Sequence, residues 1–108
     1  PADVTKAMSP LDVRDTSLER RTTEYLLKTS TFVGPLYELE KAGGLSAGNP
    51  QGAAFAADRI AAGASELRDL IVIAWKMSAT SNVGWPALKV EDVLAGKADP
   101  YESLYGKD

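Results

Sequence analysis

The chain has 108 residues, of which 44% are apolar and 25% charged, with a formal net charge of −3 and no histidine or cysteine. This length holds one hydrophobic core, and this composition is typical of a folded globular protein. The small negative charge and the scattered basic residues argue against nucleic-acid binding, which needs a basic surface. The longest apolar run, residues 70–75, is far shorter than the ~20 residues that cross a bilayer. We therefore expect a soluble or membrane-peripheral protein.

The N-terminal segment, residues 1–15, is predicted to form an extended arm, because it contains two prolines and three aspartates without sustained periodicity. Met8 and Leu11 in this arm are apolar and need a surface to lie on, which makes them candidate partner-binding residues. The chain begins with Pro1 and not Met, which fits either removal of a targeting peptide or excision of an initiator Met. Both explanations stay open.

A first long helix is predicted from about residue 17 to residue 42. It begins at the capping box Thr16–Glu19 and ends at Gly43–Gly44. Apolar residues recur at helical spacing across Gly34–Pro35, and a proline removes a helical hydrogen bond, so we expect a kink at that dipeptide. Arg20 and Arg21 either form a basic patch for an acidic partner or belong to a solvated helix face, which is the simpler interpretation.

A second long helix is predicted from Asn49–Pro50, a cap followed by a favourable first-turn proline, to about Thr80. Its apolar residues alternate spacings of four and three, which is typical of helices packed nearly parallel in bundles. The members of this seam are Ala56, Ile60, Gly63, Leu67, Leu70, Ala74 and Met77. The seam is small in its first half and bulky in its second. We expect a continuous, buried helix with Trp75 in the core.

The C-terminal part is predicted to form short helices, one over about residues 86–95 and one after Asp99–Pro100. Tyr101, Leu104 and Tyr105 would share one face of the last helix, which either docks on a partner or packs back on its own bundle. Trp85 lies in a loop, where its ring either plugs the end of the bundle or anchors a partner. No strand is expected.

Together these elements predict an all-α fold, a small up-down helical bundle built on two long antiparallel helices with short C-terminal helices. The expected organisation is an N-terminal arm of residues 1–15, a bundle of residues 16–96 and a docking tail of residues 97–108.

The chain offers little catalytic chemistry. Without histidine and cysteine it lacks the commonest general base, the usual nucleophile–base pairs and most transition-metal ligands. The carboxylates Glu38 and Glu40 diverge on a helix, and no EF-hand or glycine-rich phosphate loop is present. We therefore predict no catalytic residue, no cofactor and no metal site, and a protein that is not an enzyme.

Residues 32–40, Phe-Val-Gly-Pro-Leu-Tyr-Glu-Leu-Glu, resemble a helical segment of the PsbQ-like extrinsic proteins of photosystem II. An aromatic residue, a Gly-Pro and a Leu-x-x-Leu-charged run also occur there. The Ala-rich stretch of residues 53–77 resembles the next long helix of that family. The resemblance implies a subunit of the thylakoid lumen, imported with a removed transit peptide, that caps the water-oxidising side. Such a subunit helps to retain manganese, calcium and chloride but binds no metal and catalyses nothing itself.

Three hypotheses follow. The first is an accessory subunit that docks on a larger protein complex, most specifically photosystem II, and stabilises it. Its candidate partner-binding residues are Trp85, Tyr101, Leu104, Tyr105, Met8, Leu11, Arg20 and Arg21. The second is a stand-alone bacterial or phage helical adaptor. The third is a small helical mutase-type enzyme, which needs an inward-facing Arg or Lys that the seam of the second helix lacks. Partner, compartment and oligomeric state stay open.

Overall fold

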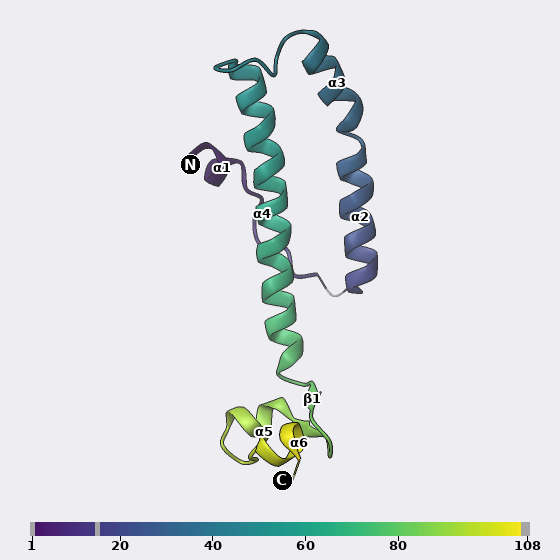
Figure 1. The fold of residues 1–108 in the computed structure, drawn as a ribbon, viewed down its shortest axis with the longest axis vertical. Helices are drawn as coiled ribbons and strands as arrows, with labels where there is room; N and C mark the ends of the chain where they lie inside the picture. The colour runs from purple at the N-terminus through teal and green to yellow at the C-terminus, as the bar shows by residue number, and fades with distance from the viewer. Residues whose placement is uncertain (1, 15, 107–108) are drawn as a thin grey trace. The chain divides into compact units, whose positions relative to one another are not determined.

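The computed structural model describes residues 2–14 and 16–106. This part of the chain is mostly helical, which confirms the helical prediction, but one short β-hairpin means that the fold is not all-α (Figure 1). Two compact units, Pro1–Asp69 and Leu70–Asp108, divide the chain differently from the predicted arm, bundle and tail. None of the helices within the described ranges is both long and apolar enough to cross a membrane.

The first unit is a helical hairpin with an N-terminal arm. Its helices are α1 (Ala2–Ala7), α2 (Leu18–Ser30), α3 (Val33–Lys41) and the part of α4 (Pro50–Ser78) that precedes Leu70. Helices α2 and α3 run antiparallel to α4 (Figure 1). The arm was predicted to be extended, yet it begins with the short helix α1. Asp3 in the first turn and Lys6 in the last turn of α1 both interact favourably with the helix dipole.

The kink in the first long helix lies at Thr31–Phe32, so the prediction at Gly34–Pro35 was wrong. The hydroxyl of Thr31 donates to the carbonyl oxygen of Lys28 at 2.7 Å, and this hydrogen bond competes with continuation of α2. Because α3 restarts at Val33, Pro35 falls in its first turn, where the missing N–H has no helical acceptor to lose. The proline therefore favours the restart and does not cause the break.

The turn between α3 and α4 depends on two close glycines. The Oδ1 atom of Asn49 accepts from the N–H of Gln51 at 2.9 Å and of Gly52 at 3.3 Å, which confirms the predicted cap of α4. A Cβ atom at Gly52 would overlap the carbonyl of Gly44. The loop can therefore approach the first turn of α4 closely only because residue 52 has no side chain.

Within the first unit, α4 has three distinct sides. One side faces α2 and α3 with Phe55, Arg59, Gly63 and Glu66. A second side faces the arm with Ser65 and Asp69, next to the fully buried Ala61. The third side carries Ile60 and Leu67, which are exposed. The predicted seam was therefore wrong for Ile60 and Leu67, because Phe55, Arg59, Gly63 and Glu66 face α2 and α3 in their place.

Little apolar surface is buried in this chain. Among the described residues, Ala61 and Ile73 are the buried apolar ones, and no large side chain is fully buried. Trp75 was expected in the core, but it is 77% exposed.

The second unit contains a β-hairpin and two short helices. Strands β1 (Asn82–Val83) and β2 (Leu88–Lys89) pair antiparallel, with Val83 opposite Leu88. Helix α5 (Val90–Leu94) follows β2 directly, so the helix predicted over residues 86–95 begins only after the strand pairing ends. Helix α6 (Tyr101–Tyr105) confirms the start signal at Asp99–Pro100.

Candidate functional site

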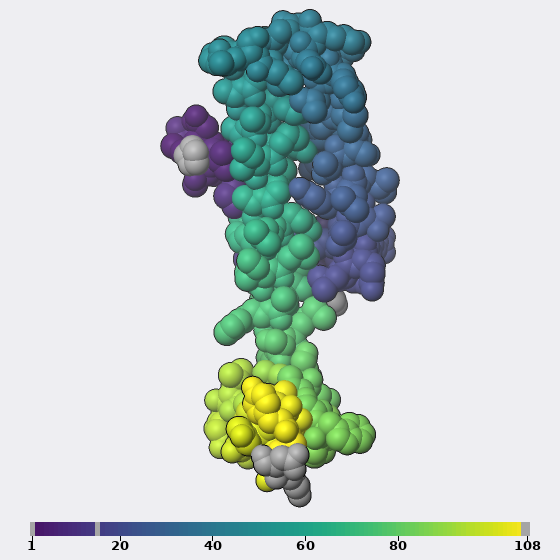
Figure 2. Space-filling view, in the orientation of Figure 1, coloured from purple at the N-terminus to yellow at the C-terminus, as the bar shows by residue number. Residues whose placement is uncertain are grey.

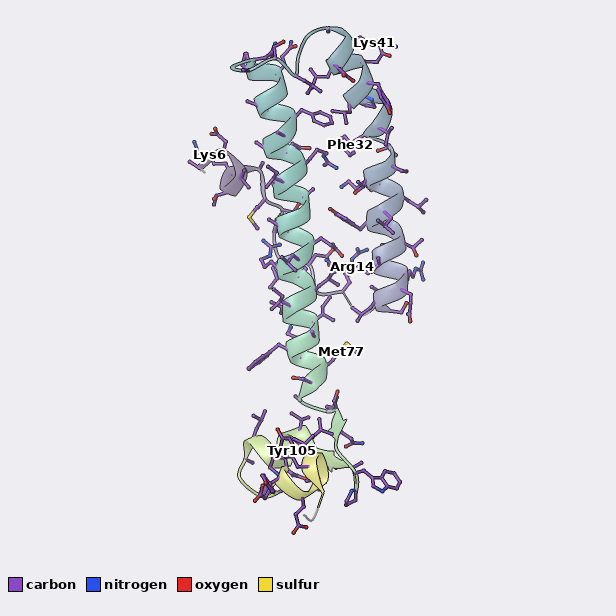
Figure 3. All side chains as sticks on the ribbon, viewed as in Figure 1. Lys6, Arg14, Phe32, Lys41, Met77 and Tyr105 are labelled. Atoms are coloured by element: carbon purple, nitrogen blue, oxygen red, sulfur yellow. The ribbon has the colours of Figure 1, made fainter. Side chains whose placement is uncertain are left out.

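The contact of α2 and α3 with α4 consists of aromatic and polar side chains (Figure 3). The rings of Phe32 and Phe55 meet edge to face with centroids 6.4 Å apart, and the guanidinium carbon of Arg59 lies 3.5 Å from the centre of the Phe32 ring. Further along, the hydroxyl of Tyr25 lies opposite Gly63, where a Cβ atom would be 3.5 Å away. That distance is an ordinary van der Waals contact, so the position would also accept a small side chain.

The third contact between α2 and α4 is a buried ion-pair cluster around Arg21, which is only 4% exposed. Its Nε and Nη2 atoms donate to the two carboxylate oxygens of Glu66 at 2.9 and 3.1 Å, a bidentate geometry. Nη2 also donates to Asp69 at 3.0 Å, and Nη1 donates to the carbonyl oxygen of Asp12 at 2.6 Å. Four of the five guanidinium N–H groups are therefore committed within the protein.

The same cluster holds the N-terminal arm on α4. We call Arg21, Ser65, Arg68 and Asp69 the arm clamp, because each contacts main-chain atoms of residues 9–12. Arg68 donates to the carbonyl oxygens of Ser9 at 2.9 Å and Pro10 at 3.1 Å. The N–H of Ser9 donates to the hydroxyl of Ser65 at 3.0 Å, and that of Asp12 to Asp69 at 3.3 Å. The arm therefore docks on its own chain.

The electrostatics of the arm clamp hold Arg21 in its charged form. The hydrogen bonds to Glu66, with the negative charges of Glu66 and Asp69, raise the pKa of Arg21 above its usual range, although burial acts in the opposite direction. Asp69 is held from the other side by Arg68, at 2.8 Å. Two arginines and two carboxylates thus balance each other, as a buried ionic cluster requires.

A cavity of about 250 Å³ lies beside the arm clamp. Its charged lining residues are Asp12, Arg14, Arg21, Glu24, Lys28, Arg59, Glu66 and Asp69. Cations and carboxylates are equal in number, so the cavity has no strong preference for an anion or a cation. Within residues 2–14 and 16–106, no group of three or more acidic side chains is arranged to hold a metal ion.

The predicted partner-binding residues of the first unit differ in their burial and in their contacts. Arg21 was predicted to lie either in a basic patch for a partner or on a solvated helix face. The solvated-face interpretation was wrong, because the side chain is buried in the arm clamp. Arg20 is exposed and lies 3.5 Å from Glu24 one turn later. Met8 is half-buried and Leu11 is exposed on the docked arm.

The predicted partner-binding residues of the second unit lie on two segments that backbone hydrogen bonding joins, the loop between β1 and β2 and helix α6. We call Trp85, Tyr101, Leu104 and Tyr105 the aromatic surface. The N–H of Trp85 donates to the carbonyl oxygen of Ser103 at 2.7 Å, and the Ser103 hydroxyl donates to the carbonyl oxygen of Pro86. The rings of Tyr101 and Tyr105 lie 5.4 Å apart. All four side chains of the aromatic surface are exposed, and Trp85 is 88% exposed.

Sequence reasoning missed Ser65, Glu66, Arg68 and Asp69. The signal that could have found them is a group of polar residues within an otherwise apolar helix, which indicates a polar contact on that side of the helix. Comparison of the chain with protein-family models, curated proteins and solved structures finds no match.

Proposed function

We propose that the chain is a non-catalytic accessory subunit that docks on a larger protein complex and stabilises it. The observation that carries this proposal is the aromatic surface, in which Trp85 and Tyr105 stay exposed although the backbone beneath them is fixed by Ser103. Tryptophan and tyrosine are the residue types that most often carry the energy of protein interfaces.

Pre-organisation supports the same proposal. Helix α6 is tied to the β-hairpin through the Trp85–Ser103 backbone hydrogen bond, so little backbone conformational entropy is lost when the rings are covered. Each ring of the aromatic surface also carries a polar tip, the Trp85 indole N–H or a tyrosine hydroxyl. The expected partner is a protein surface with apolar pockets and hydrogen-bond acceptors at their margins.

The state of Arg21 supports a non-catalytic role. A mutase-type site needs an inward-facing cation with free donors to bind an anionic substrate. Arg21 does face inward, from α2, but its hydrogen bonds go to Glu66, Asp69 and Asp12. Its role in this proposal is to hold the arm on the hairpin.

The most specific form of the proposal is an extrinsic lumenal subunit of photosystem II that supports the oxygen-evolving centre. The resemblance of residues 32–40 and 53–77 to PsbQ-like proteins supports this form, which places the protein in the thylakoid lumen. The alternative partner is a different assembly bound by a stand-alone helical adaptor.

Binding to photosystem II core particles stripped of extrinsic subunits tests the proposal. We expect saturable co-sedimentation of the wild-type chain and an affinity for Trp85→Ala that is about 30-fold weaker, the size of an interface hot spot. Trp75→Ala is the matched control, because Trp75 is exposed to a similar degree but lies outside the aromatic surface. Absence of saturable binding contradicts photosystem II as the partner. Equal losses for the two variants contradict the aromatic surface.

A further inference from the structure

The cavity beside the arm clamp contains charged groups that the arm clamp does not use. The cavity lies within the first unit and has a volume of about 250 Å³. Ser9, Pro10 and Asp12 of the arm, which passes behind α4 in the view of Figures 1 and 2, line one side of it. The other lining residues come mainly from α2 and α4. Three segments of the first unit therefore build the cavity.

Every carboxylate that lines the cavity has an arginine partner. The pairs, each with its shortest N–O distance, are Arg14–Asp12 at 2.9 Å, Arg14–Glu24 at 3.5 Å, Arg21–Glu66 at 2.9 Å and Arg68–Asp69 at 2.8 Å. A bound cation would have to displace one of these arginines. The lining therefore does not favour a cation.

The cations of the same lining are not all used in this way. Within the described part of the chain, the Lys28 ammonium has no ion-pair or hydrogen-bond partner. Arg59 pairs at 3.0 Å with Asp58, which lies outside the lining and is 59% exposed. The ion-pair partners just outside the lining bring in two arginines, Arg20 and Arg68, but only one carboxylate, Asp58. Cations are therefore in excess around the cavity, and a bound anion would balance them.

Two hydroxyl groups lie at the same end of the cavity as these cations. Tyr25, Lys28 and Thr29 are three and four residues apart on α2, so they share one face of that helix. Among the described residues, neither the Tyr25 nor the Thr29 hydroxyl has a hydrogen-bond partner. Arg59 reaches over from α4, where its guanidinium carbon lies 3.5 Å from the centre of the Phe32 ring, and Phe32 follows Lys28 by four residues. This end of the cavity thus has donors on both helices.

We infer that this end of the cavity binds a small phosphate, either the free ion or a monoester. We call Tyr25, Lys28, Thr29 and Arg59 the phosphate site. A phosphate carries close to two negative charges at neutral pH, about as many as the two cations balance, and its oxygens point in several directions. A carboxylate has one charge and two oxygens in one plane. The Nε–Nη2 side of Arg59, which suits a carboxylate best, already donates to Asp58 at 3.3 and 3.0 Å.

The dimensions of the cavity fit a small ligand. The Tyr25 hydroxyl lies opposite Gly63, and Arg59 precedes Gly63 by one helical turn, which is about 6 Å along α4. That span is about the length of two hydrogen bonds end to end, so an anion between the two donors can accept from both. The volume of about 250 Å³ is below the ~300 to 1,000 Å³ of pockets that hold drug-sized ligands. A phosphate with at most a small ester group is therefore expected.

Isothermal titration calorimetry of the full chain with inorganic phosphate tests the inference, with sodium chloride keeping the ionic strength constant. We expect saturable binding of one phosphate per chain with a Kd below about 1 mM. Methyl phosphate is the second probe. Tighter binding of methyl phosphate than of inorganic phosphate assigns the site to a monoester, and the reverse order assigns it to the free ion. Absence of saturable binding of both probes, or binding of the dicarboxylate malonate with equal affinity, overturns the inference.

Three variants locate the phosphate. Lys28→Met removes a charge and keeps an apolar side chain, so it should weaken phosphate binding at least about 10-fold, the effect of a lost hydrogen bond to a charged group. Tyr25→Phe keeps the ring and should weaken binding about 3- to 10-fold. Lys41→Met is the matched control, because Lys41 is 73% exposed on α3 and lies outside the cavity lining. It makes the same change in net charge and should leave the affinity unchanged.

Circular dichroism verifies that the three variants keep the wild-type fold. Equal weakening by Lys28→Met and Lys41→Met would indicate a general effect of net charge and overturn the inference. So would an unchanged affinity for both Lys28→Met and Tyr25→Phe. The aromatic surface belongs to the other unit, so each of these failures is distinct from loss of docking on a larger complex.

Discussion

Replacing Arg21 with methionine tests the role of the arm clamp most sharply. Methionine fills a similar volume without charge, so the loss reports mainly on the ion pairs and hydrogen bonds. The variant leaves the carboxylate of Glu66 without its bidentate partner and removes one contact of Asp69. It also frees the carbonyl of Asp12 on the arm.

The expected cost follows from how each orphaned group is placed. Removing one partner of a buried ion pair costs about 3 to 5 kcal/mol. The Glu66 side chain is 18% exposed and reaches some water, and Asp69 keeps Arg68 at 2.8 Å, so the lower end applies. We expect Arg21→Met to lower the free energy of unfolding by about 3 kcal/mol. Arg20→Met is the control, because Arg20 is exposed and its pair with Glu24 contributes less than about 0.5 kcal/mol.

Urea titration followed by far-ultraviolet circular dichroism measures both variants. In a double-mutant cycle with Glu66→Met, the double variant should cost about 1 to 3 kcal/mol less than the sum of the single ones, because no charge is then orphaned. The raised pKa of Arg21 means that its contribution is fully present below its unfolded pKa and is lost only as the pH rises through its folded pKa. The difference in the free energy of unfolding between Arg21→Met and wild type should therefore stay constant from neutral to mildly alkaline pH. Equal costs for Arg21→Met and Arg20→Met would refute the clamp.

Two further predictions concern the arm and the glycines of α4. Deletion of residues 1–12 removes the main-chain groups that the arm clamp holds. It should therefore lower the midpoint of urea unfolding by an amount equivalent to about 3 kcal/mol or more. An unchanged midpoint would mean that the arm is only loosely attached. Gly63→Ala should raise the thermal midpoint, by up to about 1 kcal/mol of added stability, because it meets only the Tyr25 hydroxyl at ordinary contact distance. Gly52→Ala, in the same helix, should lower the midpoint because its Cβ overlaps Gly44, and the reverse order of the two variants would contradict the close turn.

Local signals in the sequence located the helices well. The Asn49–Pro50 cap and the Asp99–Pro100 start signal are both observed, because capping depends on a few adjacent residues. The hairpin at Asn82–Lys89 was missed, since its two-residue strands are too short to show alternation. The kink was predicted at the wrong place because proline has two effects. It breaks the interior of a helix, but it is favourable in a first turn, where Pro35 lies in α3.

The candidate site was beyond local pattern analysis. Arg21 has the sequence context of a solvated arginine, and its burial depends on Glu66 and Asp69, which lie 45 and 48 positions away. The apolar spacing along α4 is present in the sequence, but the spacing alone could not tell that Ile60 and Leu67 would be exposed and not buried. In this fold the ion pairs bring α2 to the polar side of α4, and Ile60 and Leu67 are left exposed.

Hydroxyl-radical footprinting of the native assembly tests the central claim, that exposed aromatic side chains of this chain are covered by a larger complex. Labelling of Trp85 and Tyr105 would be compared between the purified chain and the chain within its parent complex, with Trp75 as an internal reference. The account predicts strong labelling of all three residues in the free chain, where they are exposed, and protection of Trp85 and Tyr105 but not Trp75 in the complex. Equal labelling of Trp85 and Tyr105 in the two states would contradict it.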